Sequence, residues 1–195
     1  MALKVEQGLS GITRVAGICG LLVPVVVFTC LALALLSSPW FIWTDHALSD
    51  LGVQGNTTAL FNYGMIAGGV LACIFSLGLI RVLRRKIGGY ALLFSSVALV
   101  GIGLFPETVF VLHFFTSATF FVMLTVALFL LGITMLKDPF ERLVGLLALS
   151  FAGTAMISVF FLFPLKGIAL PEAFSCFPAF IWCFIVGAKM TFLEN

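Results

Sequence analysis

Six long stretches without an acidic or basic residue divide the chain. A helix needs about 20 apolar residues to cross a hydrocarbon core of roughly 30 Å. No water inside a bilayer can satisfy the backbone, so stretches of this kind form helices. The pattern therefore predicts an all-α, polytopic integral membrane protein, a bundle of six transmembrane helices. The expected helices are 15–36, 60–79, 88–105, 109–136, 143–163 and 174–187.

Composition excludes the other broad classes of protein. Of the 195 residues, 62% are hydrophobic and 9% are charged, whereas about 25% are charged in a typical soluble domain. Disordered chains show the opposite balance, and a net charge of +2 does not indicate a nucleic-acid partner. The residues outside the six stretches make short connections, so we expect a single membrane domain over 1–195. The first stretch exceeds the apolar core of a signal peptide and is expected to remain as an anchor.

The basic residues predict how the bundle is oriented. Lys and Arg are retained on the cytoplasmic side during insertion. Six spans place nine of the ten basic residues on one side, and only Lys166 on the other. We therefore expect a multi-pass protein of the cell membrane with cytoplasmic N and C termini and the lipid bilayer as its surroundings. The nine are Lys4, Arg14, Arg81, Arg84, Arg85, Lys86, Lys137, Arg142 and Lys189.

Polar groups inside the predicted spans indicate helix packing. No Asp, Glu, Lys or Arg lies near the middle of a span, which argues against a carboxylate proton relay or a voltage sensor. We expect most of the hydroxyl groups in the spans, that of Ser117 among them, to form hydrogen bonds within a helix or between helices. Gly64 and Gly68 form a small-xxx-small pair, which we expect to allow close packing within the monomer.

The outer side collects both histidines and half of the acidic residues. The segment 44–52 predicts a short interfacial helix that is capped at Thr44 and stopped at Gly52. Such a helix places His46 and Asp50 on one face, and Asp45 and Ser49 on another. A carboxylate beside an imidazole can orient a metal-ligating or acid-base histidine.

The other two outer connections add Glu107, His113 and Glu172. His113 follows Glu107 by six residues, about 9 Å along a helix at 1.5 Å per residue. An imidazole at that depth requires a partner. We therefore expect the three connections to converge on one outward-facing polar pocket. Aromatic walls for it are expected from Trp40, Trp43, Phe110 and Phe114.

Several functions fit such a pocket. The leading hypothesis is binding or movement of a small molecule or a lipid. One alternative is a membrane-embedded, metal-dependent hydrolase of a lipid-like substrate that uses His46, Asp50, His113 and Glu172; zinc at His46, His113 and Asp50 suits the ligand types. Haem fits less well, because one histidine lies in a loop. A further alternative is a structural subunit of a membrane assembly, in which these residues only cap helices and join loops.

Three short motifs resemble the domain-of-unknown-function 998 family of prokaryotic membrane proteins. They are Ser49-Asp50-Leu51-Gly52, Leu60-Phe61-Asn62-Tyr63-Gly64 and Gly103-Leu104-Phe105-Pro106-Glu107, the last followed by His113. The resemblance implies a six-helix membrane protein without an established biochemical role. It also directs attention to Ser49, Gly52, Asn62, Pro106 and His113, and so adds Asn62 to the candidate ligand-binding residues.

Overall fold

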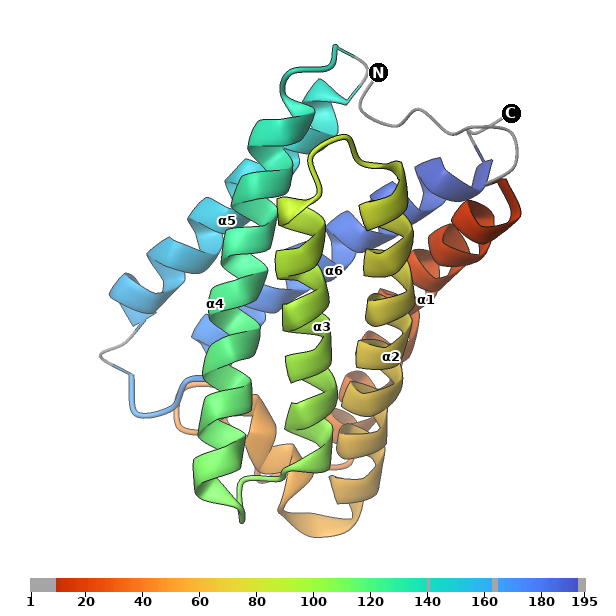
Figure 1. The fold of residues 1–195 in the computed structure, drawn as a ribbon. Coiled ribbons are helices and arrows are strands. Elements are labelled where there is room, and N and C mark those ends of the chain that lie inside the picture. The colour runs from red at the N-terminus through yellow and green to blue at the C-terminus, as the bar shows by residue number, and fades with distance from the viewer. Residues whose placement is uncertain (1–9, 140, 163–164, 193–195) are drawn as a thin grey trace.

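The computed structural model describes residues 10–139, 141–162 and 165–192, which form six long helices (Figure 1). All six are long and apolar enough to cross a membrane, and the described residues include no strand. The predicted all-α bundle of six membrane helices is therefore confirmed. The helices are α1 (Ser10–Leu36), α2 (Thr58–Val82), α3 (Ile87–Leu104), α4 (Phe110–Met135), α5 (Arg142–Leu162) and α6 (Ala169–Phe192).

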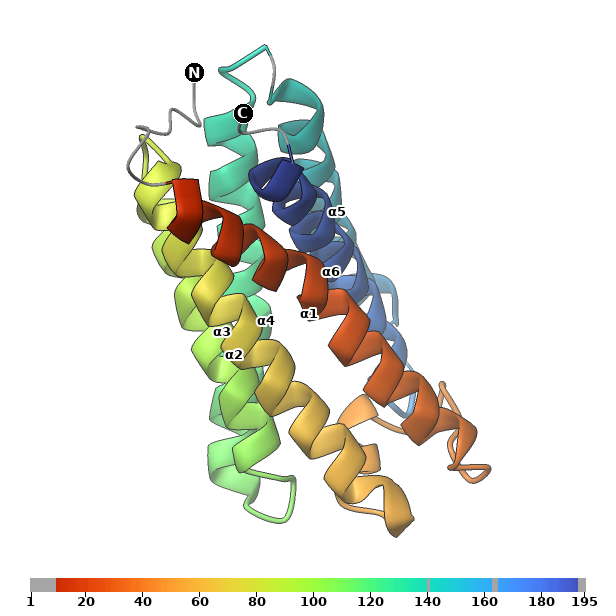
Figure 2. The same cartoon turned by 90° about the vertical axis from the view of Figure 1, so that its right-hand side faces the viewer.

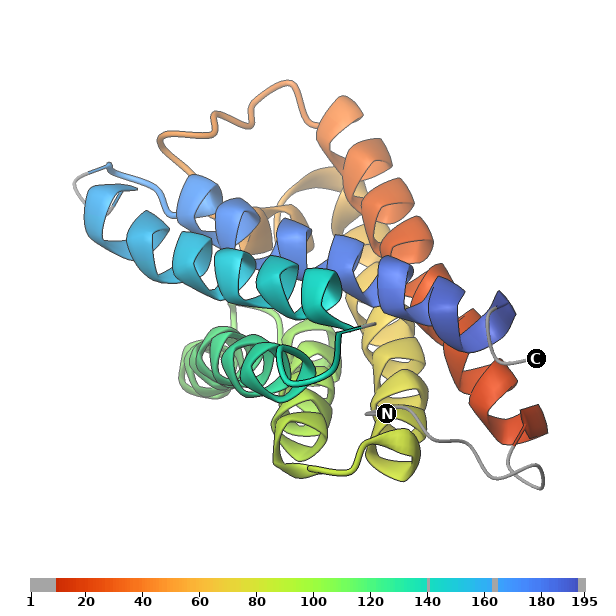
Figure 3. The same cartoon turned by 90° about the horizontal axis from the view of Figure 1, so that it is seen from above.

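The helices form a closed ring in chain order. Each packs against the next, and α6 returns to pack against α1. In Figure 1, α2, α3 and α4 run side by side while α1, α5 and α6 cross behind them at an angle. Figure 2 shows α1 beside α6, and Figure 3 shows α5 and α6 lying together above α4. Short turns favour this order because they place consecutive helices next to each other.

The bundle has two different ends. We call the end with residues 37–57, 105–109 and 165–168 the distal end; it lies at the bottom of Figure 1. The proximal end holds the start of α1, the end of α6, the turn 83–86 and the residues 136–139 after α4. At the distal end two short 3₁₀ helices, η2 (Leu48–Gly52) and η3 (Gly55–Thr57), precede α2.

The helix bounds differ most from the prediction in α6. It begins at Ala169 and ends at Phe192, five residues beyond each expected limit. Pro171 lies in its first turn, where the backbone N–H groups have no partner within the helix, so a proline costs little. Pro178 lies inside the helix without ending it.

Glycines allow the helices to approach closely. A Cβ on Gly64 would lie 2.5 Å from Cys30 Cβ, and one on Gly68 would meet the side chain of Val27. The predicted pair therefore packs α2 against α1 within the monomer. The crossing of α1 and α6 is equally close, because a Cβ on Gly187 would lie 2.6 Å from the carbonyl oxygen of Gly17.

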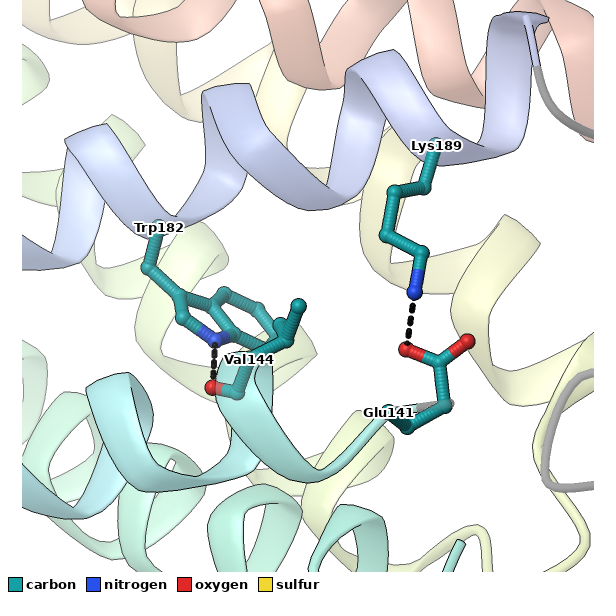
Figure 4. A network of polar contacts seen from close by, with 4 residues as sticks. All are labelled: Glu141, Val144, Trp182 and Lys189. Carbon is teal, nitrogen blue, oxygen red and sulfur yellow. Dashed lines mark hydrogen bonds and ion pairs between the residues drawn. The ribbon is translucent and has the colours of Figure 1, made fainter. Parts of the chain in front are cut away.

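Buried polar contacts join the helices at several depths. Ser76 and Ser96 link α2 to α3 through hydroxyls 3.3 Å apart, and Ser95 donates to Phe120 O at 3.0 Å. Near the proximal end, Trp182 Nε1 donates to Val144 O at 3.1 Å, and Lys189 Nζ lies 2.7 Å from Glu141 Oε2 (Figure 4). These contacts fit the interpretation of the intramembrane hydroxyls as packing groups.

The outward faces of the helices are apolar. Large side chains such as Val15, Leu77, Phe94 and Phe160 are at least half exposed on four different helices. A contiguous apolar surface of this kind requires lipid around it rather than water. The chain therefore belongs in a lipid bilayer as a multi-pass protein.

Candidate functional site

The distal segment that connects α1 to α2 folds differently from the prediction. Within 44–52, only Leu48–Gly52 is helical, as the 3₁₀ turn η2, and Ala47 rather than Thr44 precedes it. Asp50 turns back and accepts a hydrogen bond from Ala47 N at 3.0 Å. His46 lies outside this helix, so the expected shared helical face of His46 and Asp50 was wrong. The bond from Ala47 N to the Asp50 carboxylate belongs to a capping box, which starts the helix at Leu48 rather than after Thr44.

This segment is fixed to the connection before α6 by main-chain hydrogen bonds. Gly167 N donates to Thr44 O at 2.8 Å, and Ala169 N donates to His46 O at 2.9 Å. A third bond runs from Leu48 N to Glu172 Oε2 at 2.7 Å. This bond satisfies a free N–H at the start of η2 with an acidic group, the favoured arrangement at a helix N-terminus.

Asn62 and Glu107 hold the other side of the segment. Asn62 Nδ2 donates to Gly52 O at 3.0 Å, and Gly52 packs so tightly that a Cβ would lie 2.5 Å from Asn62 Oδ1. The Glu107 carboxyl interacts with the Asp50 carboxyl. Burial, then a hydrogen bond with the Asp50 side chain, then the charge of Asp50 raise the pKa of Glu107 to about 7. All three distal connections therefore meet at η2.

We call the contacts of Asn62, Glu107 and Glu172 with the segment around η2 the clasp, and we expect its stability to depend on pH. The pKa of Glu107 is raised above the ordinary value of 4.5, so the folded protein binds more protons than the unfolded chain between these two values. The contribution of Glu107 to the free energy of unfolding should therefore be fully present below about pH 4.5 and be lost as the pH rises through about 7. Glu107 is half-exposed, which limits the change to about 1 kcal/mol or less. Thermal unfolding in detergent at several pH values measures it.

The control for this prediction is Glu107→Gln, in which an amide can still donate to Asp50 but does not titrate. Its midpoint temperature should change less between pH 5 and pH 8 than that of the unchanged protein. Asp45→Asn is the matched variant, because Asp45 is exposed and bonds only locally, to the Thr44 hydroxyl at 3.0 Å. An equal loss of pH dependence in both variants would show that the Asp50–Glu107 pair is not its source.

A cavity lies under η2, within the distal half of the bundle. The space open to water inside it is about 40 Å³. That space exceeds the 10–15 Å³ needed for one water. Every long helix except α5 contributes to the wall. Three polar residues, Ser49, Ser117 and Glu172, face a lining that is otherwise apolar or sulfur-containing: Val27, Leu31, Leu48, Phe61, Met65, Leu99, Ile102, Phe120, Phe121, Cys176, Phe177 and Phe180.

His113 lies in the first turn of α4, and it has partners on both ring nitrogens. Its side chain is buried, with Nδ1 2.8 Å from Phe105 O and Nε2 3.3 Å from Ser117 Oγ. A carbonyl oxygen only accepts, so Nδ1 carries the proton, and the Ser117 hydroxyl donates to Nε2. The ring thus joins the turn before α4 to a hydroxyl that lines the cavity.

His46 lies in a different environment. Its ring stacks on Phe41 with centroids 5.6 Å apart and meets Trp40 edge-on at 5.2 Å, while Nδ1 lies within 3.2 Å of the Ile42 backbone. Across the described part of the chain, no group of three or more His, Cys, Asp and Glu side chains is placed to hold a metal ion. The geometry therefore gives no support to the zinc alternative at His46, His113 and Asp50.

The expected aromatic walls were also wrong. Phe110 and Phe114 on α4 are 69% and 57% exposed. Trp40 and Trp43 pack around Phe41 rather than against the cavity. The cavity walls come instead from phenylalanines further along α2, α4 and α6. Hydropathy does not distinguish these rings, because each helix is apolar on all sides.

The structure thus divides the predicted site residues into three groups. Asp50, Glu107, Glu172 and Asn62 meet around η2, and Ser49 on η2 faces the cavity with Glu172. His113 lies next to the cavity through Ser117. Asp45 and His46 belong to the surface of the segment. From the sequence alone, Ser117 was expected to be only a packing hydroxyl. Its spacing of four residues from His113, which places both side chains on one helix face, was the signal that could have identified it.

Comparison with known proteins gives one finding. No curated protein and no solved structure matches the chain. A family model described as "Protein of unknown function (DUF998)" matches residues 18–189, which include all six helices in whole or in large part. The chain therefore belongs to this family of proteins of unknown function, and the predicted resemblance to that family is confirmed.

Proposed function

We propose that the protein binds an apolar molecule or lipid chain in the cavity under η2, with a polar group of the ligand at Ser49, Ser117 and Glu172. The observation that carries this proposal is the lining of the cavity. A wall of aromatic and aliphatic side chains with a few polar groups is typical of a small-molecule site. The bilayer around the bundle supplies apolar molecules directly.

The clasp around η2 supports the same function. Leu48 and Ser49 belong both to η2 and to the cavity wall. Release of the bond from Leu48 N to Glu172 Oε2 would free the carboxylate for a ligand and loosen the cover at once. Such coupling between a cover and a ligand group is how binding sites open and close. Movement of a ligand across the distal leaflet would need this release.

We also propose the orientation in which the proximal end faces the cytoplasm of the cell membrane. Eight of the basic residues lie at or near the proximal end, whereas Lys166 is in the distal connection before α6; Lys4 lies outside the described residues. The retention of positive charge on the cytoplasmic side supports this arrangement. The cavity would then open toward the outer leaflet.

A photoreactive fatty acid tests the binding proposal. Purified protein in mild detergent is irradiated with a medium-chain fatty acid that bears a diazirine, and the modified residues are identified by mass spectrometry. We expect modification of cavity residues on α4 and α6, such as Phe121 and Phe177, and competition by the unmodified fatty acid. Met65→Trp, which fills the cavity, should reduce this labelling roughly tenfold, equivalent to about 1.4 kcal/mol of binding free energy.

The matched control places the same side chain on the lipid-facing side of the same helix. Ile74 on α2 is 39% exposed, whereas Met65 is 7% exposed and lines the cavity. Ile74→Trp should leave cavity labelling unchanged. Equal labelling in the two variants, or labelling spread over the lipid-facing surface alone, would contradict the binding proposal and favour a structural bundle.

A further inference from the structure

We propose that Ser117 is a nucleophile that His113 activates. Ser117 would take the acyl group from a lipid-like carboxylic ester bound in the cavity. This inference rests on the proposed ligand cavity and adds a reaction to it. It differs from the hydrolase alternative of the sequence analysis because it needs no metal ion. Three observations carry it: the serine–histidine contact, the fixed tautomer of the ring, and the place of Ser117 in the cavity wall.

The first two observations describe a base that is ready to accept a proton. Phe105 O lies 2.8 Å from His113 Nδ1 and holds the proton on that nitrogen. Nε2 is then unprotonated and lies 3.3 Å from Ser117 Oγ. A nucleophile in contact with a base that a third group orients is the arrangement found in enzymes that form acyl intermediates. Slightly long contacts of this kind are usual before substrate binds.

The helix itself creates the contact. His113 and Ser117 are four residues apart on α4, so their side chains lie one above the other on the same face. His113 lies in the first turn of α4, directly after the turn in which Val109 N bonds Pro106 O at 2.8 Å. The dyad is therefore built from local structure, and α4 presents its hydroxyl to the ligand.

The third observation is the surroundings of the hydroxyl. Most intramembrane hydroxyls of this chain donate to a carbonyl of their own helix, as Ser76 does to Ala72 O at 2.7 Å. Ser117 instead contacts the imidazole and faces a cavity with aromatic walls from Phe120, Phe121 and Phe177. These walls offer the apolar contacts that an acyl chain requires, and the space exceeds that needed for one water.

The reaction balances with water as the second reactant. Ser117 Oγ bonds to the ester carbonyl carbon while its proton passes to His113 Nε2. The bond from that carbon to the alcohol oxygen then breaks, and the alcohol leaves with the proton from His113. A water molecule next attacks the acyl-serine, again giving its proton to His113, and the carboxylic acid departs as Ser117 regains its hydrogen. No electron donor or metal takes part.

Covalent labelling tests the nucleophile directly. An alkyl fluorophosphonate with a fluorescent tag reacts with activated serines and not with ordinary hydroxyls. The full chain in mild detergent should be labelled at Ser117, as located by mass spectrometry, and Ser117→Ala should abolish the label. His113→Gln should slow labelling by roughly 100-fold or more, the usual contribution of a general base. The control is Ser150→Ala, which replaces an exposed serine on α5. This variant should be labelled at the same rate as the unchanged protein.

The outcomes separate this inference from the binding proposal. Absence of label on the unchanged protein, persistence of label in Ser117→Ala, or a label at another residue would each overturn the nucleophile. In those cases fatty-acid labelling of the cavity can still succeed, and binding without catalysis is then the result. Thermal unfolding of His113→Gln is measured alongside, so that a slow label in a protein that keeps its midpoint temperature reports the loss of the base.

Discussion

Replacing Trp182 by alanine is expected to lower the free energy of unfolding by about 3–5 kcal/mol, the usual cost of removing a buried tryptophan. Trp182 is the largest side chain that is fully buried, with 0% of its surface exposed. Its ring meets Phe75 of α2 with centroids 6.5 Å apart, and its Nε1 donates to Val144 O of α5. One side chain of α6 therefore contacts two other helices (Figure 4 shows the bond to α5). Unfolding by increasing denaturing detergent in mixed micelles measures the loss.

Two further variants separate the contributions of Trp182. Trp182→Phe keeps most of the ring but removes the donor, which should cost about 1–2 kcal/mol, because Val144 O is buried. Ile181→Ala truncates the neighbouring side chain, which is 46% exposed toward lipid; its cost should be below about 1 kcal/mol, because lipid replaces the lost contacts. If Trp182→Ala and Ile181→Ala destabilise equally, the packing assigned to Trp182 is incorrect.

Replacing Gly187 by leucine is expected to prevent formation of a folded monomer. A Cβ at Gly187 would lie 2.6 Å from Gly17 O and 2.7 Å from Leu21 N. Both are backbone atoms of α1, so neither can move aside as a side chain can. Even alanine should cost about 1–3 kcal/mol, the range for an overpacked site. Leucine would force α1 and α6 apart and open the ring of helices. Size-exclusion chromatography in detergent should show aggregate instead of a single peak.

Gly153 provides the matched control for Gly187. It also lies within a helix, α5, but a Cβ there would have no atom within 4 Å. Gly153→Ala should therefore be neutral or stabilising by about 0.5–1 kcal/mol, because alanine favours helix over glycine. A similar loss of stability at both glycines would indicate that helix propensity, and not the close approach of α1 and α6, decides the effect.

The sequence predicted most of the fold because its signals are local. All six helices begin and end within five residues of their expected limits, and only α6 differs by five residues at both ends. Hydropathy and span length depend on neighbouring residues in the chain and not on tertiary contacts. Prediction was poorer where two local signals competed. Pro171 and Pro178 both bear on where α6 begins, and the segment 44–52 carries cap and stop residues for a longer helix than forms.

The candidate site was predicted in part. The convergence of the three distal connections was expected, and Asp50, Glu107 and Glu172 do meet around η2. The grouping of His46 with His113 was not supported, because each ring has separate partners. The phenylalanines that face the cavity could not be chosen from 22 in the chain. A helix that is apolar on every side gives no period from which its inward face can be identified.

The sequence by itself determined that this chain crosses a membrane six times, which end collects positive charge, and how deep each polar residue lies along its helix. The tertiary structure alone decided which residues meet. The bond from Leu48 to Glu172 joins residues 124 apart in the chain, and the cavity takes its wall from five helices and η2. The physical reason is that hydropathy fixes the position of a residue along the membrane normal. Its rotation about the helix axis, and its neighbours across the bundle, depend on close packing of every helix at once.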